Sequence, residues 1–171
     1  GTDEHELVRE TAAHLNERQG RETSAVGGHA GLSTVEKMIA LRSAPIFSSL
    51  PPEGLAELGR ASVEHEYVAD EALCVQGESG NEVFILLAGE VNVLIGHGAN
   101  AKVVAEEKAG GFIGEMAVLD PAPRSATVVA KAGGVRVLRL DGDAFRDALN
   151  TDVAIASGVI RTLAQRLRGK A

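Results

Sequence analysis

Aromatic residues are scarce in this sequence: tryptophan is absent, and Phe and Tyr together make up 3% of its 171 residues. An apolar core must therefore be built mainly from Val, Leu, Ile and Ala, and few rings are available for stacking on nucleic-acid bases. Positive charge is also in deficit, since 17 Lys and Arg face 24 Asp and Glu, for a formal net charge of -7. Because surfaces that bind nucleic acids are basic, this composition argues against a nucleic-acid partner.

Cysteine and long apolar runs are lacking as well. Cys74 is the single cysteine, which excludes an internal disulfide framework and fits a reducing compartment. No apolar run approaches the roughly 20 residues of a membrane span, and nothing at the start reads as a signal peptide. We therefore expect a cytoplasmic domain of a longer protein, a description that also fits the cytosolic domain of a membrane protein.

Patterns typical of catalysis and of metal binding are not found either. The five histidines show no metal-ligand spacing, and there is no Cys-x-x-Cys pair. The glycine-rich stretch 27–31 lacks the Gly-Lys-Ser/Thr of a phosphate-binding P-loop, and no Gly-x-Ser-x-Gly motif occurs. With no catalytic pair in sight, the sequence predicts a protein that is not an enzyme and has no metal or cofactor.

The chain divides into three parts. Residues 1–20 are predicted to form a helix that resembles the second half of a HEAT-like repeat, although an ordinary amphipathic helix is the alternative. Residues 21–32 are rich in glycine and predict a flexible linker. Residues 33–171 contain the remaining periodic segments and form the predicted domain.

Helices are expected at both ends of that domain. Ser33 and Glu36 form a capping box for a helix that extends to Ser43, with Val35, Met38 and Ile39 expected on its buried side. A second helix is predicted over 53–62, a short one over 141–149 and a longer one over 153–168. The stripe expected to be apolar on the last helix comprises Val153, Ala156, Val159, Ile160, Leu163, Ala164 and Leu167. A basic run on the same helix, at Arg161, Arg166, Arg168 and Lys170, is expected to be solvated.

Between these helices the pattern is that of short strands with glycine turns. Alternating apolar residues, as in Val91, Val93 and Ile95, are typical of a half-buried strand, whereas the continuous run 83–87 indicates a central one. Strands are predicted at 64–68, 72–76, 83–88, 90–96, 102–107, 126–131 and 135–140. Many short strands with glycine corners predict a sandwich or a barrel.

One stretch, residues 110–128, combines features that suit a nucleotide. Two prolines limit the apolar run 116–119 to about one helical turn, whose free N–H groups attract an anion. Arg124 follows, and its planar guanidinium suits a phosphate. Glu115 would repel a phosphate, but its carboxylate can accept hydrogen bonds from the hydroxyls of a sugar. An acid for a sugar and an arginine for a phosphate together describe a nucleotide ligand.

This stretch resembles the phosphate-binding cassette of cyclic nucleotide-binding domains, as found in cyclic AMP receptor proteins, protein kinase A regulatory subunits and gated channels. The resemblance rests on Phe112-Ile113-Gly114-Glu115-Met116-Ala117 and on Arg124-Ser125-Ala126, and it extends from about Thr34 to the end of the chain. One departure is Gly110-Gly111, where the family usually has Gly-Asp. The resemblance implies a mainly β fold with flanking helices: an eight-stranded, jelly-roll-like β-roll (a double-stranded β-helix) with N-terminal helices and C-terminal lid helices.

The resemblance also implies a ligand and its contacts. Glu115 would accept from the ribose 2′-hydroxyl and Arg124 would pair with the cyclic phosphate. The remaining residues expected to contact the ligand are Gly114, Met116, Ala117 and Ser125 around the phosphate, and Val93 and Val104 as walls of the base site. The expected ligand is cAMP, with cGMP as the alternative, because Ser125 follows the arginine as in bacterial cyclic AMP receptors.

Three interpretations stay open at this point. The leading one is a cyclic nucleotide sensor that regulates a fused or partner effector by movement of its C-terminal helix. A related alternative is the regulatory domain of a multidomain transporter or channel. In the family the last helix either closes over the base or pairs with a second protomer, so a homodimer through this helix is possible. A nucleotide-free β-roll that serves as a scaffold is the second interpretation. The third is a DNA-binding regulator, but residues 169–171 leave no room for a helix-turn-helix after the last helix.

Overall fold

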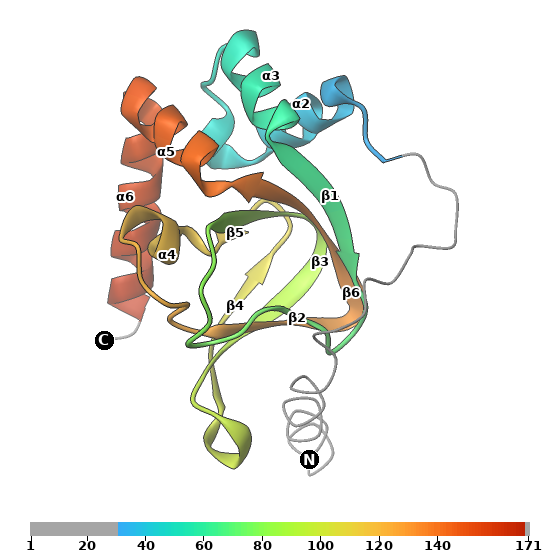
Figure 1. The fold of residues 1–171 in the computed structure, drawn as a ribbon, viewed down its shortest axis with the longest axis vertical. Coiled ribbons are helices and arrows are strands. Elements are labelled where there is room, and N and C mark those ends of the chain that lie inside the picture. The colour runs from blue at the N-terminus through green and yellow to red at the C-terminus, as the bar shows by residue number, and fades with distance from the viewer. Residues whose placement is uncertain (1–30, 170–171) are drawn as a thin grey trace.

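The computed structural model describes residues 31–169, so the helix predicted in 1–20 and nearly all of the predicted linker lie outside the described residues. The elements occur in the order α2 (Thr34–Ser43), a 3-10 turn (Pro45–Phe47), α3 (Pro52–Arg60), β1 (Ser62–Tyr67), β2 (Ala72–Cys74), β3 (Glu82–Ile95), a 3-10 turn (Gly98–Asn100), β4 (Lys102–Lys108), β5 (Phe112–Ile113), α4 (Glu115–Leu119), β6 (Thr127–Asp141), α5 (Gly142–Thr151) and α6 (Val153–Gly169). The strands wrap into a roll, with α2, α3 and α5 over one end and α6 along one side, next to α4 (Figure 1).

All strand pairs are antiparallel. The path through the sheet is β1-β6-β3-β4, while β2 pairs with β6 and β5 pairs with β3. The longest ladder joins β3 to β6, from Glu82 opposite Asp141 to Leu94 opposite Thr127. This arrangement confirms the predicted mainly β roll with flanking helices.

Two predicted strand breaks, at Ala88-Gly89 and at Gly133-Gly134, are wrong. Strands β3 and β6 continue through them, and the β3–β6 register shifts between 86 and 91. All three glycines have positive φ, and a β-carbon at Gly89 would meet the backbone of Gly134 and Val135. Glycine therefore bends both strands without ending their pairing, as in a β-bulge. Because β3 and β6 are each bent into two segments, the six strands supply eight segments.

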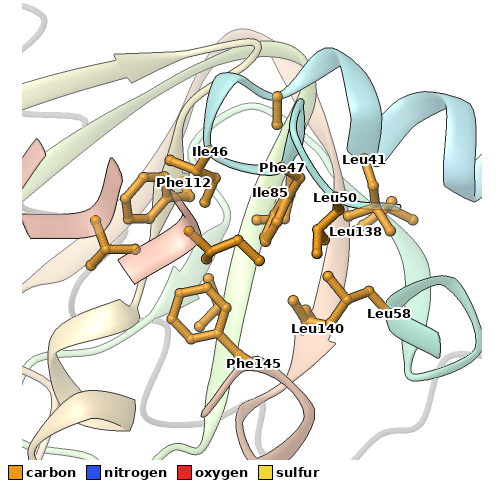
Figure 2. Close-up of a cluster of buried hydrophobic side chains, with 14 of the residues drawn as sticks. Leu41, Ile46, Phe47, Leu50, Leu58, Ile85, Phe112, Leu138, Leu140 and Phe145 are labelled. Atoms are coloured by element: carbon orange, nitrogen blue, oxygen red, sulfur yellow. The ribbon is translucent and has the colours of Figure 1, made fainter. Parts of the chain in front are cut away.

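Strand β3 separates two apolar clusters. Val83 and Ile85 belong to the cluster beneath the helices, whereas Phe84 and Leu86 belong to a cluster made by the strands alone. Both faces of this stretch are thus covered, which explains its continuous apolar run. Figure 2 shows the helix-side cluster, where residues of α2, α3 and α5 meet those of β3 and β6.

The start of α2 follows the prediction, but its buried side does so only at Met38, which packs against the helix-side cluster. The Ser33 N–H donates to Glu36 Oε2 (2.7 Å) and the Glu36 N–H to Ser33 Oγ (3.3 Å), which completes the predicted capping box. Val35 and Ile39, expected to be buried, are exposed. The helix instead turns Leu41 into the helix-side cluster, so its buried face lies about one residue further around the helix than predicted.

The face that helix α6 presents to the core matches the predicted stripe only in part, at Val159 and Leu163. Ile155 and Val159 are its buried residues, with Leu163 packed beside them, whereas Val153, Ile160 and Leu167 are exposed. The reason is the contact with the 3-10 turn 45–47, where a β-carbon at Gly158 would lie only 3.4 Å from Ile46. Asp152 caps the helix by accepting from the N–H groups of residues 154 (2.8 Å) and 155 (3.2 Å).

Two further features concern the outline of the domain. The N–H of Leu32, the last residue of the predicted linker, donates to Glu64 Oε2 (3.1 Å), and its side chain packs against the helix-side cluster. Within residues 31–169, none of the helices has both the length and the apolar character needed to cross a membrane.

Candidate functional site

Arg124 is buried, with 5% of its surface exposed, in the segment that joins α4 to β6. Its Nη1 donates to the carbonyl oxygens of Glu82 (3.1 Å) and Gly114 (3.0 Å). The guanidinium also lies over the ring of Phe84, with Cζ 5.6 Å from the ring centroid. These contacts fix the plane and the position of the charge.

Two glycines make the room that Arg124 occupies. A β-carbon at Gly80 would lie 2.7 Å from Cζ of Arg124, and one at Gly114 would lie 2.8 Å from its Nη1. Gly114 in addition has φ +88, a conformation that other residues rarely adopt. The backbone of Arg124 is held by the same loop, because its N–H donates to the carbonyl of Glu78 and its carbonyl accepts from Gly77, both at 2.8 Å.

Glu115, the first residue of α4, is 2% exposed and pairs with a residue of α6. Nη1 of Arg166 donates to Glu115 Oε1, and Nη2 donates to Glu107 Oε2 (3.2 Å) and to the carbonyl of Phe112. The guanidinium lies 5.2 Å from the centroid of the Phe112 ring. The carboxylate expected to bind a ribose is therefore held by a cation from the C-terminal helix.

The burial of these two charges is unusual for the molecule. Among residues 31–169, Glu115 and Arg124 are the charged residues that are buried. Burying a charge is costly unless it is paired and hydrogen-bonded. Here Arg166 pairs with Glu115, and the carbonyls of Glu82 and Gly114 accept from Arg124. Gly114 joins them: it precedes Glu115 in the chain, and its carbonyl accepts from Arg124.

The neighbouring residues expected at the ligand vary in exposure. Met116 is exposed while Ala117 is buried in α4. Ser125 is exposed, and its hydroxyl donates to Sδ of Met116 at 3.9 Å. The structure thus gathers Gly114, Glu115, Met116, Ala117, Arg124 and Ser125 on α4 and on the segments that flank it.

The two valines expected to line the base site lie on other elements, β3 and β4. Val93 pairs with Ala105 across the β3–β4 ladder and with Val128 across the β3–β6 ladder. It is half-buried against the strand cluster, whereas Val104 is exposed. Their place as walls around a base remains a prediction.

Three contributors to the site were not found from the sequence. Arg166 was expected to be solvated, and that expectation is wrong because the residue faces α4 and β5. A signal existed, since Arg166 follows the buried Ile155 and Val159 and the partly buried Leu163 at helical steps of four, four and three. Glu107 gave no comparable signal, because it is one acid of an exposed strand.

The third contributor, Arg146, connects α4 to α5. Its Nη1 donates to the carbonyl of Val118 (2.6 Å) near the end of α4, and to Asn81 Oδ1 (3.3 Å). Its Nη2 pairs with Asp143 in the first turn of α5. Arg146 therefore fixes the far end of the short helix that begins at Glu115.

Residues suited to a metal are not gathered anywhere in the described part of the chain, where no group of three or more His, Cys, Asp or Glu could hold an ion. A buried guanidinium can pair with a phosphate, and a buried carboxylate can accept from a hydroxyl.

Solved structures show the same fold. The regulatory domain of Toxoplasma gondii PKA, crystallised with cAMP, superposes with a TM-score of 0.68 at 20% sequence identity, over 77% of this chain and 50% of that one. At this identity the likeness establishes the fold alone.

Sequence comparison leads to regulatory proteins. The cAMP-dependent protein kinase regulatory subunit of Neurospora crassa is 33% identical over 109 residues, which cover 64% of this chain and 28% of the relative. A cyclic nucleotide-gated potassium channel of Rhizobium etli is 34% identical over 125 residues, which cover 73% of this chain and 34% of the channel. The matched part is thus about a third or less of either relative.

The family model for the cyclic nucleotide-binding domain matches residues 64–152, which is more than half of the chain and includes Glu115 and Arg124. The roll, the match and the buried pair agree, and the chain belongs to the cyclic nucleotide-binding domain family.

Proposed function

We propose that this chain is a non-catalytic sensor domain that binds a cyclic nucleotide, with cAMP preferred over cGMP. The observation that carries the proposal is the pair of buried charges at Gly114: Glu115 follows this glycine in the chain, and Arg124 donates to its carbonyl. In this proposal Arg124 pairs with the cyclic phosphate and Glu115 accepts from the ribose 2′-hydroxyl. The named functions of the relatives, a kinase regulatory subunit and a gated channel, support a regulatory role.

Arg124 is suited to its proposed role because its Nη1 is already engaged. Two carbonyls and the Phe84 ring hold the guanidinium in place, so little side-chain entropy remains to be lost on binding. A buried guanidinium has already lost most of its contact with water, so the desolvation cost of pairing with an anion is smaller than for an exposed one. The site is therefore selective for a ligand that carries a compact negative charge.

The proposal extends to regulation through α6. This helix is packed on the domain by Ile155 and Val159, and its last turns reach the ribose-binding carboxylate through Arg166. Ligand at Glu115 would therefore change the stability of α6 in its docked position, and an effector attached to or packed on the helix would sense that change. Regulation of a fused or partner effector, and a cytoplasmic location, are parts of this proposal.

Calorimetric titration with cAMP tests the proposal. We expect the parent chain to bind, and Arg124→Ala to lose about 2–5 kcal/mol of binding free energy because a buried charge pair is removed. Arg136→Ala is the matched control: its side chain is half-exposed on β6, so its affinity should equal that of the parent. A parent that does not bind cAMP or cGMP would favour the nucleotide-free scaffold instead.

A further inference from the structure

Glu82, the first residue of β3, meets Arg124 with its backbone while its side chain is engaged elsewhere. Its carbonyl accepts from Nη1 of Arg124 at 3.1 Å, whereas its carboxylate accepts from Nη2 of Arg139 at 2.6 Å. A carboxylate is a stronger acceptor for a guanidinium than a carbonyl is. The stronger acceptor of Glu82 is therefore held away from the buried arginine, and the group that holds it is a second arginine.

The ring of Phe84 relates the two arginines to one face of the sheet. The guanidinium of Arg124 lies over this ring, 5.6 Å from its centroid, and Arg139 is the residue opposite Phe84 in the β3–β6 ladder. Directly opposite residues of an antiparallel pair project to the same face, and so do residues two apart in one strand. Glu82, two residues before Phe84, therefore shares this face with both arginines.

The thiol of Cys74 shows that Arg124 and the acid of Glu82 act on one environment. Burial raises the pKa of this thiol, the guanidinium of Arg124 lowers it, and the carboxylates of Glu78 and Glu82 raise it. Charges of both signs thus influence a single partly buried group of β2. The carboxylate of Glu82 is near enough to this region for its pairing to affect Arg124.

The ion pair of Arg139 with Glu82 matters more for the charge near Arg124 than for stability. Its two side chains are 36% and 39% exposed, and an exposed ion pair stabilises a fold only slightly. While the pair is formed, its two charges offset each other and the positive charge of Arg124 remains for an anion. Without Arg139, the carboxylate of Glu82 would compete with a phosphate for Arg124 and repel it.

We propose that Arg139 is a positioning residue, which holds the Glu82 carboxylate away from Arg124 and so keeps that guanidinium available to the phosphate of the ligand. The inference rests on the proposed function and deepens it, since it names a second cation on which the phosphate contact depends. Arg139 acts through Glu82 and does not itself contact the ligand.

The first test is calorimetric titration with cAMP. Arg139→Ala should weaken binding by about tenfold, because the freed carboxylate competes for Arg124. In a chain that already carries Glu82→Gln, the same substitution should weaken binding by less than about threefold. Arg136→Ala is the matched control, since it removes an equal charge from an ion pair on the same strand and should leave the affinity unchanged.

Two results of this titration would overturn the proposal. One is an Arg139→Ala chain that binds cAMP as tightly as the parent. The other is an equal loss with and without Glu82→Gln, which would mean that Arg139 acts by a route other than this acid. If Arg139→Ala failed to fold, Arg139→Met, which keeps the apolar part of the side chain, would take its place in both backgrounds.

The second test needs no ligand. A crystal structure of the ligand-free Arg139→Ala chain should place the Glu82 carboxylate within ion-pair distance of the Arg124 guanidinium. A carboxylate that turned to solvent instead would refute the proposal. If the parent chain bound neither nucleotide, the proposed function would fail, while this structure would still decide whether Arg139 keeps Glu82 from Arg124.

Discussion

Gly80 and Arg124 lie in direct contact, such that a β-carbon on the glycine would stand 2.7 Å from Cζ of the arginine. Gly80→Ala should therefore displace the guanidinium from its position against Glu82 and Phe84. We expect the affinity for cAMP to fall by about tenfold or more, since a small misplacement of a preorganised charge forfeits much of its binding energy. Calorimetric titration measures this directly.

A matched control for that change is Gly59→Ala in α3. A β-carbon at Gly59 would make ordinary contacts, 3.5 Å or longer, and the helix is remote from Arg124. Its affinity for cAMP should equal that of the parent. If Gly80→Ala and Gly59→Ala bound cAMP with equal affinity, displacement of Arg124 would not weaken binding and the prediction would be wrong.

Glu115→Gln should discriminate between two ligands that differ in one hydroxyl. A carboxylate contributes as an acceptor only when the 2′-hydroxyl donates to it, so cAMP should weaken far more than its 2′-deoxy analogue. The difference should be about 1.5–3 kcal/mol, the range for hydrogen bonds to charged groups. Equal losses for the two nucleotides would instead assign Glu115 to the structure of α4.

The preference for cAMP over cGMP should be about tenfold or greater. The valines expected around the base, Val93 and Val104, offer no partner for the extra polar groups of guanine, and each unpaired group costs about 1–3 kcal/mol. Ser125 is the residue that could reverse this order, because its hydroxyl is held only by a 3.9 Å contact to Met116. Competition of both nucleotides against one fluorescent analogue measures the preference, and equal potency would refute it.

Cys74 offers a measurement that is independent of ligand. Burial raises the pKa of its thiol, and Sγ lies 3.8 Å from the carbonyl oxygen of Ala126, to which it donates. Since the thiolate is the reactive form, a raised pKa means less thiolate at pH 8 and slower alkylation. Iodoacetamide should react with Cys74 about tenfold or more slowly than with glutathione at pH 8, and as fast in urea. A native thiol as reactive as glutathione would contradict the position of β2.

The site could be predicted to the extent that it is local in sequence. Gly114, Glu115 and Arg124 lie within one short stretch whose residue types already imply a sugar and a phosphate, and the structure places them together. Arg166 could not be found in this way, because it is 51 residues from Glu115 and a basic helix end is usually solvated. Which residue Arg166 pairs with depends on how α6 packs on the domain, and no local sequence pattern predicts that packing.

The fold class could be predicted from the sequence, but the bends within strands β3 and β6 could not. A glycine such as Gly89 fits a turn between two strands as well as a bulge within one, and only the pairing partner decides between them. Here the partner of Gly89 is Val135 of β6, and the backbone of Gly134 and Val135 leaves no room for a side chain at Gly89. Val35 and Ile39 were misplaced for a related reason, since a short helix with apolar residues on several sides does not reveal which side its neighbours cover.

The division of β3 between two clusters links the position of Arg124, the proposed phosphate contact, to the helices by a single register. Phe84, under the guanidinium of Arg124, and Ile85, beneath the helices, are consecutive residues that point to opposite faces. A slip of one position along β6 would exchange them, taking the ring from under the arginine and placing it among the helix-side chains. The β3–β6 pairing that closes the roll therefore also sets which residue lies under Arg124 and which residue packs beneath the helices.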